Sequence, residues 1–184
     1  MTMKEMLKLK NIQIVSACKD WEDSIHVAVQ PLVDDGSVTS AYIDGIIANA
    51  HEFGPYFVLT PDLALLHARP EQGVIHQQLA VTVVREGVVF KEGNAPVRVL
   101  VTLAAQNPND HIDVMRILAT MFACEANITS IAQAQTRKQA YKNSRCRQDV
   151  NDNLKYCHLT SFLYVCALYE NAAHNNWIYH ELLM

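Results

Sequence analysis

One histidine stands where it could do chemistry, at the end of a short apolar run. His67 follows Leu63–Leu66 and precedes Ala68–Pro70, a turn that carries one arginine. A histidine held at the end of a strand is rigid and can still reach solvent, which suits a group that takes something from one partner and gives it to another. Neutral imidazole is a competent nucleophile near pH 7, because its reference pKa is about 6.5. A buried core histidine is the plainer interpretation of the same spacing.

Two residues near this histidine are able to hold an anion. Arg69 lies two residues beyond His67 and can offer a fork of donors to phosphate oxygens. His111 follows Asp110, which is expected to cap a helix, and so falls in the first turn, where free amide groups favour an anion. The alternative for both is an ordinary solvent-exposed role, Arg69 in a loop and His111 in the first turn.

Three further residues have two possible roles each. Thr60 and Asp62 could orient an imidazole N–H, or they simply make the turn before the apolar run. His51 falls late in a predicted helix, where it either faces the site or complements the carboxyl end of the helix dipole. The sequence alone leaves these alternatives open.

The histidines and cysteines do not form a metal-binding pattern. The chain has 8 histidines and 5 cysteines, but no His-x-x-x-His and no Cys-x-x-Cys spacing. We therefore expect no metal site and no disulfide framework, with thiols that are reduced and mostly buried.

Composition narrows the class of protein. With 184 residues, of which 50% are hydrophobic, the chain is long enough for one domain, or one domain with an extension. A net charge of -4 argues against non-specific nucleic-acid binding, which needs a basic surface. The longest apolar stretches are too short to cross a bilayer, and the first ten residues lack the apolar segment of a signal peptide. We expect a cytoplasmic protein without direct membrane insertion.

Two helices are expected first, because apolar residues recur at helical spacing behind capping residues. The first helix begins after Asp20 and ends or kinks at Pro31; the second is capped by Thr39 and stopped by Gly54-Pro55. The elements expected next are strands over 56–59, 63–66 and 79–84, a turn at 86–87 into 88–90, and a central strand over 97–105. A helix capped by Asp110 follows, with apolar residues on one side over 114–122. Helices, then strands, then helices indicate an α/β sandwich.

The end of the chain differs in composition. No glycine occurs after Gly93 and no proline after Pro108, and apolar residues from 159 to 169 return at helical spacing. This divides the chain into a domain over 1–140 and an atypical, helical extension over 141–184. The extension has too much apolar surface to remain in water, so it should pack on the body or on another copy, forming a homo-oligomer.

The segment around His67 also carries a motif. It opens with Gly-Pro-Tyr-Phe-Val at Gly54 and continues to the frame His-Ala-Arg-Pro-Glu-x-Gly-Val, which begins at His67. In both parts, and in the Asn-Asp-His that ends at His111, the chain resembles the type 2 enzyme IIA of the bacterial sugar phosphotransferase system. The likeness covers about residues 1–138, and the opening is shared most closely with the ascorbate-type branch.

The resemblance implies a phosphoryl relay on a mixed sheet flanked by helices. In that family a histidine at the position of His67 accepts phosphate from the phosphocarrier HPr. It passes the phosphate to a cysteine of an enzyme IIB domain, which phosphorylates a sugar during uptake. The phosphoryl group would be supported by His111 across the site and by Arg69, Thr60 and His51. Neither a metal nor an organic cofactor would be needed.

Three residues depart from the family pattern. Leu66 replaces a proline, Asp62 replaces a glycine, and His51 stands where mannitol-type members carry an arginine. The ascorbate-type branch also lacks this arginine, so Arg69 would supply the positive charge. The alternative function is a regulatory or interaction module on the same fold, with catalysis weakened by the changes at positions 62 and 66. These residues do not identify the sugar, although an ascorbate-like substrate is compatible with them.

Overall fold

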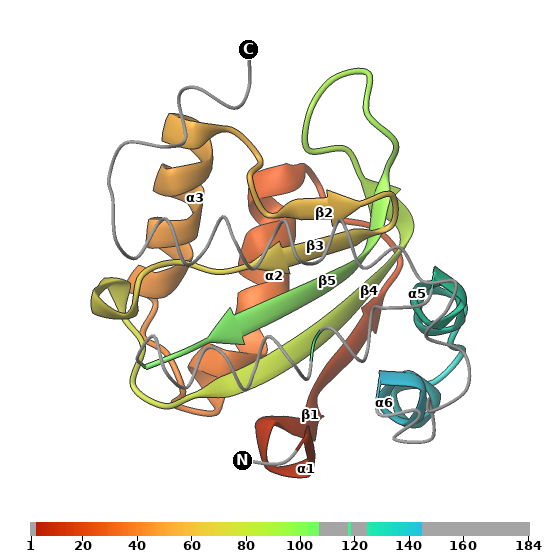
Figure 1. Cartoon of the computed structure of the whole chain (residues 1–184), viewed down its shortest axis with the longest axis horizontal. Coiled ribbons are helices and arrows are strands. Elements are labelled where there is room, and N and C mark those ends of the chain that lie inside the picture. Colours follow the sequence, from red (N-terminus) through yellow and green to blue (C-terminus); the bar gives the residue numbers. More distant parts are fainter. Residues whose placement is uncertain (1–2, 107–117, 119–124, 145–184) are drawn as a thin grey trace, which may run out of the picture.

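The computed structural model describes residues 3–106, 118 and 125–144, which form an α/β fold around one sheet (Figure 1). The elements follow in the order α1 (Met3–Met6), β1 (Leu7–Val15), α2 (Trp21–Asp34), α3 (Ala41–Phe53), β2 (Val58–Thr60), β3 (Leu63–Leu66), the 3-10 turn η1 (Pro70–Gln72), β4 (Gln78–Val88), β5 (Val97–Ala104), α5 (Glu125–Ala132) and α6 (Arg137–Ser144). The strand order is β1-β4-β5-β3-β2. Neighbours β1/β4 and β3/β5 are parallel, whereas β4/β5 and β2/β3 are antiparallel. The predicted mixed sheet flanked by helices is confirmed.

Apolar side chains form a core on each face of the sheet. Helices α2 and α3 cover one face, and α5 and α6 lie on the side of the other (Figure 1). Strand β5 serves both cores, because its successive side chains point to opposite faces. Val99, Val101 and Leu103 belong to one core, and Leu100 and Ala104 to the other. The prediction of a central strand covered on both faces is therefore confirmed.

Helix α2 begins as predicted and passes through its proline. The Asp20 carboxylate accepts a hydrogen bond from the Asp23 amide at 2.8 Å, so Asp20 is the N-cap. Pro31 does not end the helix, because another residue takes over the role of its missing N–H. The Gln13 side chain on β1 donates to the Val27 carbonyl at 2.5 Å, the acceptor that residue 31 would otherwise bond.

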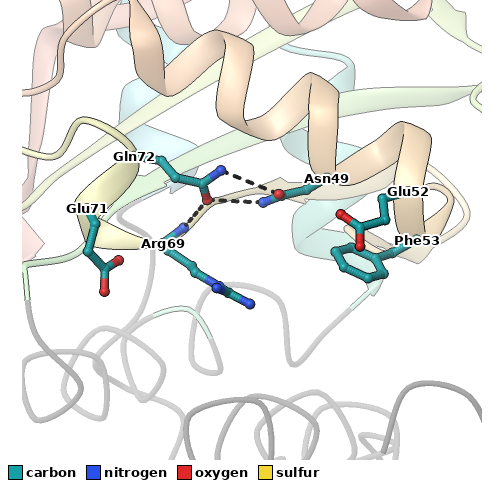
Figure 2. Close-up of a pocket in the computed structure, with 6 residues that line it drawn as sticks. All are labelled: Asn49, Glu52, Phe53, Arg69, Glu71 and Gln72. Carbon is teal, nitrogen blue, oxygen red and sulfur yellow. Dashed lines mark hydrogen bonds between the residues drawn. The ribbon is translucent and has the colours of Figure 1, made fainter. Parts of the chain in front are cut away.

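Helix α3 lies against the turn η1. Its N-cap is Ser40 rather than the predicted Thr39, whose amide instead donates to the Gly73 carbonyl at 2.8 Å. The helix stops at Gly54, as predicted, where φ is 78°. One helical turn before its end, the side chain of Asn49 faces Gln72 of η1 (Figure 2).

The strands differ from the prediction in their bounds. Strand β3 lies where it was expected, but β2 starts at Val58, two residues late. Strand β4 does not turn at residues 86–87 and continues to Val88, which pairs with Val97 of β5. The pairing shifts register between Val83 and Val88, and Gly87 has φ 74°. The glycine therefore serves a bulge in one strand rather than a hairpin turn.

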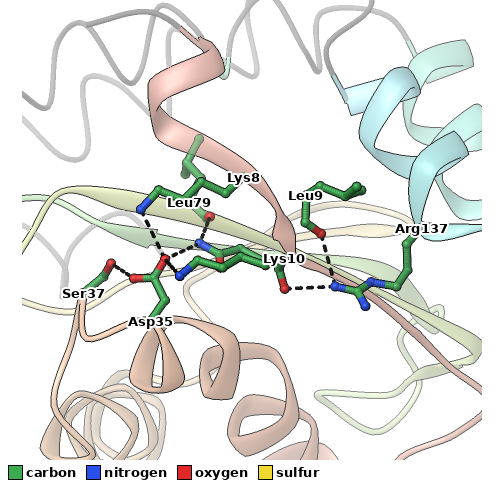
Figure 3. A network of polar contacts seen from close by, with 8 residues as sticks. Lys8, Leu9, Lys10, Asp35, Ser37, Leu79 and Arg137 are labelled. Carbon is green, nitrogen blue, oxygen red and sulfur yellow. Dashed lines mark hydrogen bonds and ion pairs between the residues drawn. The ribbon is translucent and has the colours of Figure 1, made fainter.

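Strand β1 is an edge strand that the sequence analysis does not predict, although the alternation Leu7-Lys8-Leu9-Lys10 fits a strand period. The side chain of Asp35, at the end of α2, is only 3% exposed and anchors this strand (Figure 3). The ammonium groups of Lys8 and Lys10 lie 3.4 and 3.3 Å from the carboxylate. Burial alone would raise the pKa of Asp35, but its hydrogen bonds and the lysine charges lower it to about 2.

On the other side of β1, Arg137 at the start of α6 donates hydrogen bonds to the strand. Its guanidinium donates to the carbonyls of Leu9 at 3.2 Å and Lys10 at 3.1 Å (Figure 3). It also donates to the carbonyl of Ile12 at 2.6 Å. An edge strand presents unpaired carbonyls of this kind. Arg137 therefore covers part of the outer edge of the sheet.

The described part of the chain reaches slightly beyond the predicted boundary at residue 140. Helix α6 spans that boundary, and both Ala140 and Ser144 are fully buried. The predicted helical extension over 141–184 lies outside the described residues from 145 onward. Of the predicted helix over 114–122, only Leu118 is described, and it is helical and buried. The division into two parts stays a prediction.

Candidate functional site

His67 lies at the carboxyl end of β3, one residue beyond the last paired position. Its Nδ1 is 2.8 Å from the carbonyl oxygen of Leu65. A carbonyl oxygen can only accept, so Nδ1 carries the ring proton in the neutral imidazole. The lone pair of that tautomer is on Nε2, which makes Nε2 the nucleophilic atom of the ring.

The surroundings of His67 keep its ring in place and favour its neutral form. The side chain is half-buried, and the ring of Tyr56 meets it edge to face at 5.2 Å between centroids. Burial lowers the pKa of His67, against the hydrogen bond to Leu65, which raises it. The imidazole is therefore unprotonated at neutral pH and ready to act as a nucleophile.

Two tyrosine hydroxyls hold the peptide group that joins His67 to Ala68, one at its carbonyl and the other at its amide. The Tyr56 hydroxyl donates to the carbonyl of His67 at 2.6 Å. The Tyr42 hydroxyl accepts from the Ala68 amide at 3.0 Å and donates to the Leu103 carbonyl on β5 at 2.6 Å. These bonds connect the histidine segment to helix α3 and to the central strand.

Arg69 is exposed and lies beside a surface hollow of about 640 Å³. Its backbone amide donates to the Gln72 side chain at 2.9 Å, while its own side chain extends away from Gln72 (Figure 2). The hollow is lined by Asn49, Glu52, Phe53, Arg69, Glu71 and Gln72. The structure thus places one guanidinium two residues from His67, on the protein surface.

Thr60 is not close to His67. It pairs with Leu63 at the other end of β3, and at roughly 3.3 Å per residue His67 lies about 13 Å further along the strand. The Thr60 hydroxyl donates to the carbonyl of Pro61 at 3.1 Å. Thr60 belongs to the turn, so the prediction that it supports the phosphoryl group is not upheld by its position.

His51 is placed on another side of helix α3. Its Nε2 lies 2.8 Å from the carboxylate of Glu22, and its ring contacts Trp21 edge to face at 5.1 Å. At about 100° per residue, His51 is turned well away from Asn49 and Phe53, which face the hollow. His51 therefore joins α3 to the start of α2, and the structure does not bring it to the site.

The other two departures from the family pattern are accommodated by the fold. Asp62 has φ 72°, a left-handed conformation in which glycine is the easiest residue. Its carboxylate accepts two hydrogen bonds from Arg98, at 2.6 and 2.5 Å, which stabilise the turn. Leu66 is fully buried in the core beside α2 and α3. Both side chains thus have structural roles, and the alternative of a regulatory module with weakened catalysis stays a prediction.

His111 lies outside the described residues, so its predicted place across the site stays a prediction. Strand β5 runs parallel to β3, so the carboxyl ends of both strands, with His67, lie at the same end of the sheet. Among the residues described, no three His, Cys, Asp or Glu side chains are grouped to hold a metal ion. The same part of the chain contains no helix that is long and apolar enough to cross a membrane.

Two residues near the site are absent from the sequence-based prediction. Tyr42 falls within the second predicted helix and Gln72 within the turn after His67, but neither was assigned a role in the site. Tyr42 forms hydrogen bonds with Ala68 and Leu103, and Gln72 forms one with Arg69. Gln72 stands at the unspecified position of the frame that begins at His67, and its one local signal is its place three residues after Arg69, as in a capping box.

Comparisons with known proteins agree with this geometry. Residues 5–143 match the family described as phosphoenolpyruvate-dependent sugar phosphotransferase system, EIIA 2. The mannitol-specific cryptic phosphotransferase enzyme IIA component of Escherichia coli (strain K12) is 27% identical over 139 residues, 76% of this chain and 95% of the relative. The ascorbate-specific EIIA component of Shigella flexneri is 32% identical over 133 residues, 71% of this chain and 86% of the relative.

The fold gives the same result. The solution structure of the mannitol-specific cryptic enzyme IIA from Escherichia coli superposes with a TM-score of 0.73 at 26% identity. The match covers 78% of this chain and 98% of that structure. The resemblance noted in the sequence is confirmed, and the chain belongs to the EIIA 2 family of the phosphoenolpyruvate-dependent sugar phosphotransferase system, whose enzyme IIA components are phosphotransferases.

Proposed function

We propose that this protein is a phosphocarrier that uses His67 as its phosphorylated residue. The Nε2 lone pair attacks the phosphorus of a phosphohistidine on HPr. The new N–P bond forms as the N–P bond of the donor breaks, and the donor imidazole leaves with that electron pair. In the second step a cysteine thiolate of an enzyme IIB domain attacks the same phosphorus, and His67 is released as neutral imidazole.

The tautomer of His67 is the observation that carries this proposal. The Leu65 carbonyl fixes the proton on Nδ1, so Nε2 keeps its lone pair. Burial lowers the pKa of the ring, so the lone pair is available at neutral pH. Phosphoryl transfer needs little covalent chemistry from the protein beyond such positioning and neutralisation of charge.

Two groups are proposed to stabilise the phosphoryl oxygens. Arg69 offers up to two parallel N–H donors from the turn that follows His67. His111 comes seven residues after the end of β5, and β5 ends at the same edge of the sheet as β3. Neither residue needs a metal to act, and we propose none.

The proposal of a IIB partner is supported by likeness of fold. A solved complex of mannitol enzyme IIA with phosphorylated enzyme IIB from Escherichia coli contains a IIA chain that superposes on this one with a TM-score of 0.66, at 23% identity. The relatives are named for mannitol and for ascorbate. We therefore propose a sugar as the final acceptor and leave its identity open.

The test is transfer of labelled phosphate from phospho-HPr, followed by mapping of the labelled residue. We expect one acid-labile, alkali-stable phosphate on His67, and none on a His67→Gln variant. Because a glutamine side chain has a volume similar to that of histidine, circular dichroism and the melting temperature of the variant should match those of the wild type. Label that persists in the variant would refute the site, and an unlabelled, folded wild type would refute the function.

A further inference from the structure

Three consecutive residues after β3 are each held through a backbone group by a side chain from elsewhere. The His67 carbonyl is bound by Tyr56 and the Ala68 amide by Tyr42. The Arg69 amide is bound by the side-chain oxygen of Gln72, three residues ahead in the turn η1. The segment that bears the nucleophile and the guanidinium is thus fixed at every residue.

Gln72 differs from the two tyrosines, because it is itself fixed by a polar contact to helix α3. The same Oε1 that accepts from Arg69 also accepts from Asn49 Nδ2 at 3.2 Å, and Gln72 Nε2 donates back to Asn49 Oδ1 at 3.4 Å (Figure 2). The oxygen therefore has both lone pairs engaged. The amide group connects the backbone of Arg69 directly to one turn of α3.

The side chain of Gln72 packs closely against helix α3 at Gly45. A Cβ added to Gly45 of α3 would lie 2.9 Å from Gln72 Nε2 and 3.0 Å from Gln72 Cβ. The residue after Gln72 is held as tightly, because a Cβ on Gly73 would clash with the Thr39 hydroxyl oxygen. The turn η1 therefore lies directly on α3, and a side chain at residue 45 would push it away.

We propose that Gln72 is a positioning residue for phosphoryl transfer, which holds Arg69 in register with His67 by fixing the Arg69 amide to Asn49 of helix α3. This role rests on the proposed function. It requires no contact between Gln72 and the phosphoryl group. Transfer depends steeply on placement, since a shift of about 1 Å can cost on the order of a hundredfold in rate.

The experiment compares single-turnover transfer from phospho-HPr to the wild type, to Gln72→Ala and to Asn49→Ala. We expect the rate at saturating donor to fall about tenfold in Gln72→Ala and less in Asn49→Ala. The donor concentration at half-maximal rate should change less than twofold, because the turn, and not the docking surface, is altered. The double variant should be no slower than Gln72→Ala alone, since both residues act through one contact.

Gln30→Ala is the matched control, since Gln30 is an exposed glutamine on α2 whose side chain bonds Asp34 of the same helix. It should transfer within twofold of the wild type. Amide hydrogen exchange supplies a readout that does not depend on transfer. The Arg69 amide should exchange at least tenfold faster in Gln72→Ala, while the Ala68 amide, held by Tyr42, should keep its wild-type rate.

The outcomes separate the two proposals. If the wild type takes up phosphate on His67 but Gln72→Ala transfers at the wild-type rate, the positioning role is overturned and the proposed function stands. Slower transfer with unchanged exchange at Arg69 also overturns the role, because the rate is then lost by another route. If the wild type takes up no phosphate, the proposed function fails, and the role of Gln72 in transfer fails with it.

Discussion

The two ends of strand β3 carry polar residues that are used in opposite ways. At the start, the Asp62 carboxylate is engaged on both oxygens by Arg98. At the end, Nδ1 of His67 is engaged by a backbone carbonyl, which leaves the ring's lone pair on Nε2. One residue has its charge neutralised within the fold, whereas the other is positioned so that one atom remains chemically competent.

This difference shows how one short strand can separate stability from activity. The four residues of β3 are all buried and have apolar side chains. The strand therefore fixes where its two ends lie but offers no polar side chain of its own. Side chains at the Asp62 end close a turn with a left-handed residue, and those at the His67 end hold three backbone groups. Substitutions at the first end should therefore change the free energy of unfolding, and those at the second end the rate of transfer.

The largest effect is expected at the Asp62 end. Asp62→Ala loses both bonds to Arg98 and places alanine at a positive φ, so we expect a loss of about 2 kcal/mol in the free energy of unfolding. Asp62→Gly loses the same bonds without the backbone strain and should lose only about 1 kcal/mol. Urea unfolding measures both values. Phosphoryl transfer should stay at the wild-type rate, and a slower transfer would mean that the two ends are not independent.

A second prediction concerns pH at the His67 end. Because burial lowers the pKa of His67 below its ordinary value, the ring should still be mostly neutral at pH 6.5, where a histidine with a pKa of about 6.5 is half protonated. Between pH 7.5 and 6.5, transfer should therefore fall by less than the half that a histidine of ordinary pKa would lose. An NMR titration of the His67 ring proton on Cε1 separates this titration from that of HPr. A midpoint at or above 6.5 would contradict the buried neutral ring.

The smallest effect is expected for Tyr56→Phe. The variant keeps the ring that contacts His67 but removes the hydroxyl that donates to its carbonyl, a hydrogen bond of about 1 kcal/mol. We expect transfer to slow by about threefold, measured by single-turnover labelling. Thr60→Ala removes one hydroxyl at the other end of β3 and should leave transfer unchanged. Equal rates for Tyr56→Phe and Thr60→Ala would remove the distinction between the two ends.

The features that the sequence predicts correctly have local causes. The cap at Asp20, the stop at Gly54, strand β3 and the central strand β5 each follow from a few adjacent residues. Strand β1 was missed although its alternation of leucine and lysine is a local signal; its pairing with β4, about 70 residues away, has none. The passage of α2 through Pro31 depends on Gln13 in that same strand, so a local rule for proline could not foresee it.

The candidate site shows the same division. His67 and Arg69 follow from a local motif, and their shared role in one site stays a prediction. Thr60 and His51 each had two possible roles, because sequence proximity does not say at which end of a strand, or on which side of a helix, a residue falls. Tyr42 acts through contacts between elements, which have no local signal in the chain, and so does the bond of Gln72 to Asn49, whereas its bond to Arg69 is local.

The contact between Arg137 and β1 has a consequence for synthesis. The guanidinium bonds the carbonyls of Leu9, Lys10 and Ile12, the last of them 125 residues earlier in the chain. While the protein is being translated, β1 leaves the ribosome early, but the arginine that covers its outer edge emerges only near the end of the family domain. For most of that time the nascent chain carries an open strand edge, the kind of surface on which unfinished chains pair with one another.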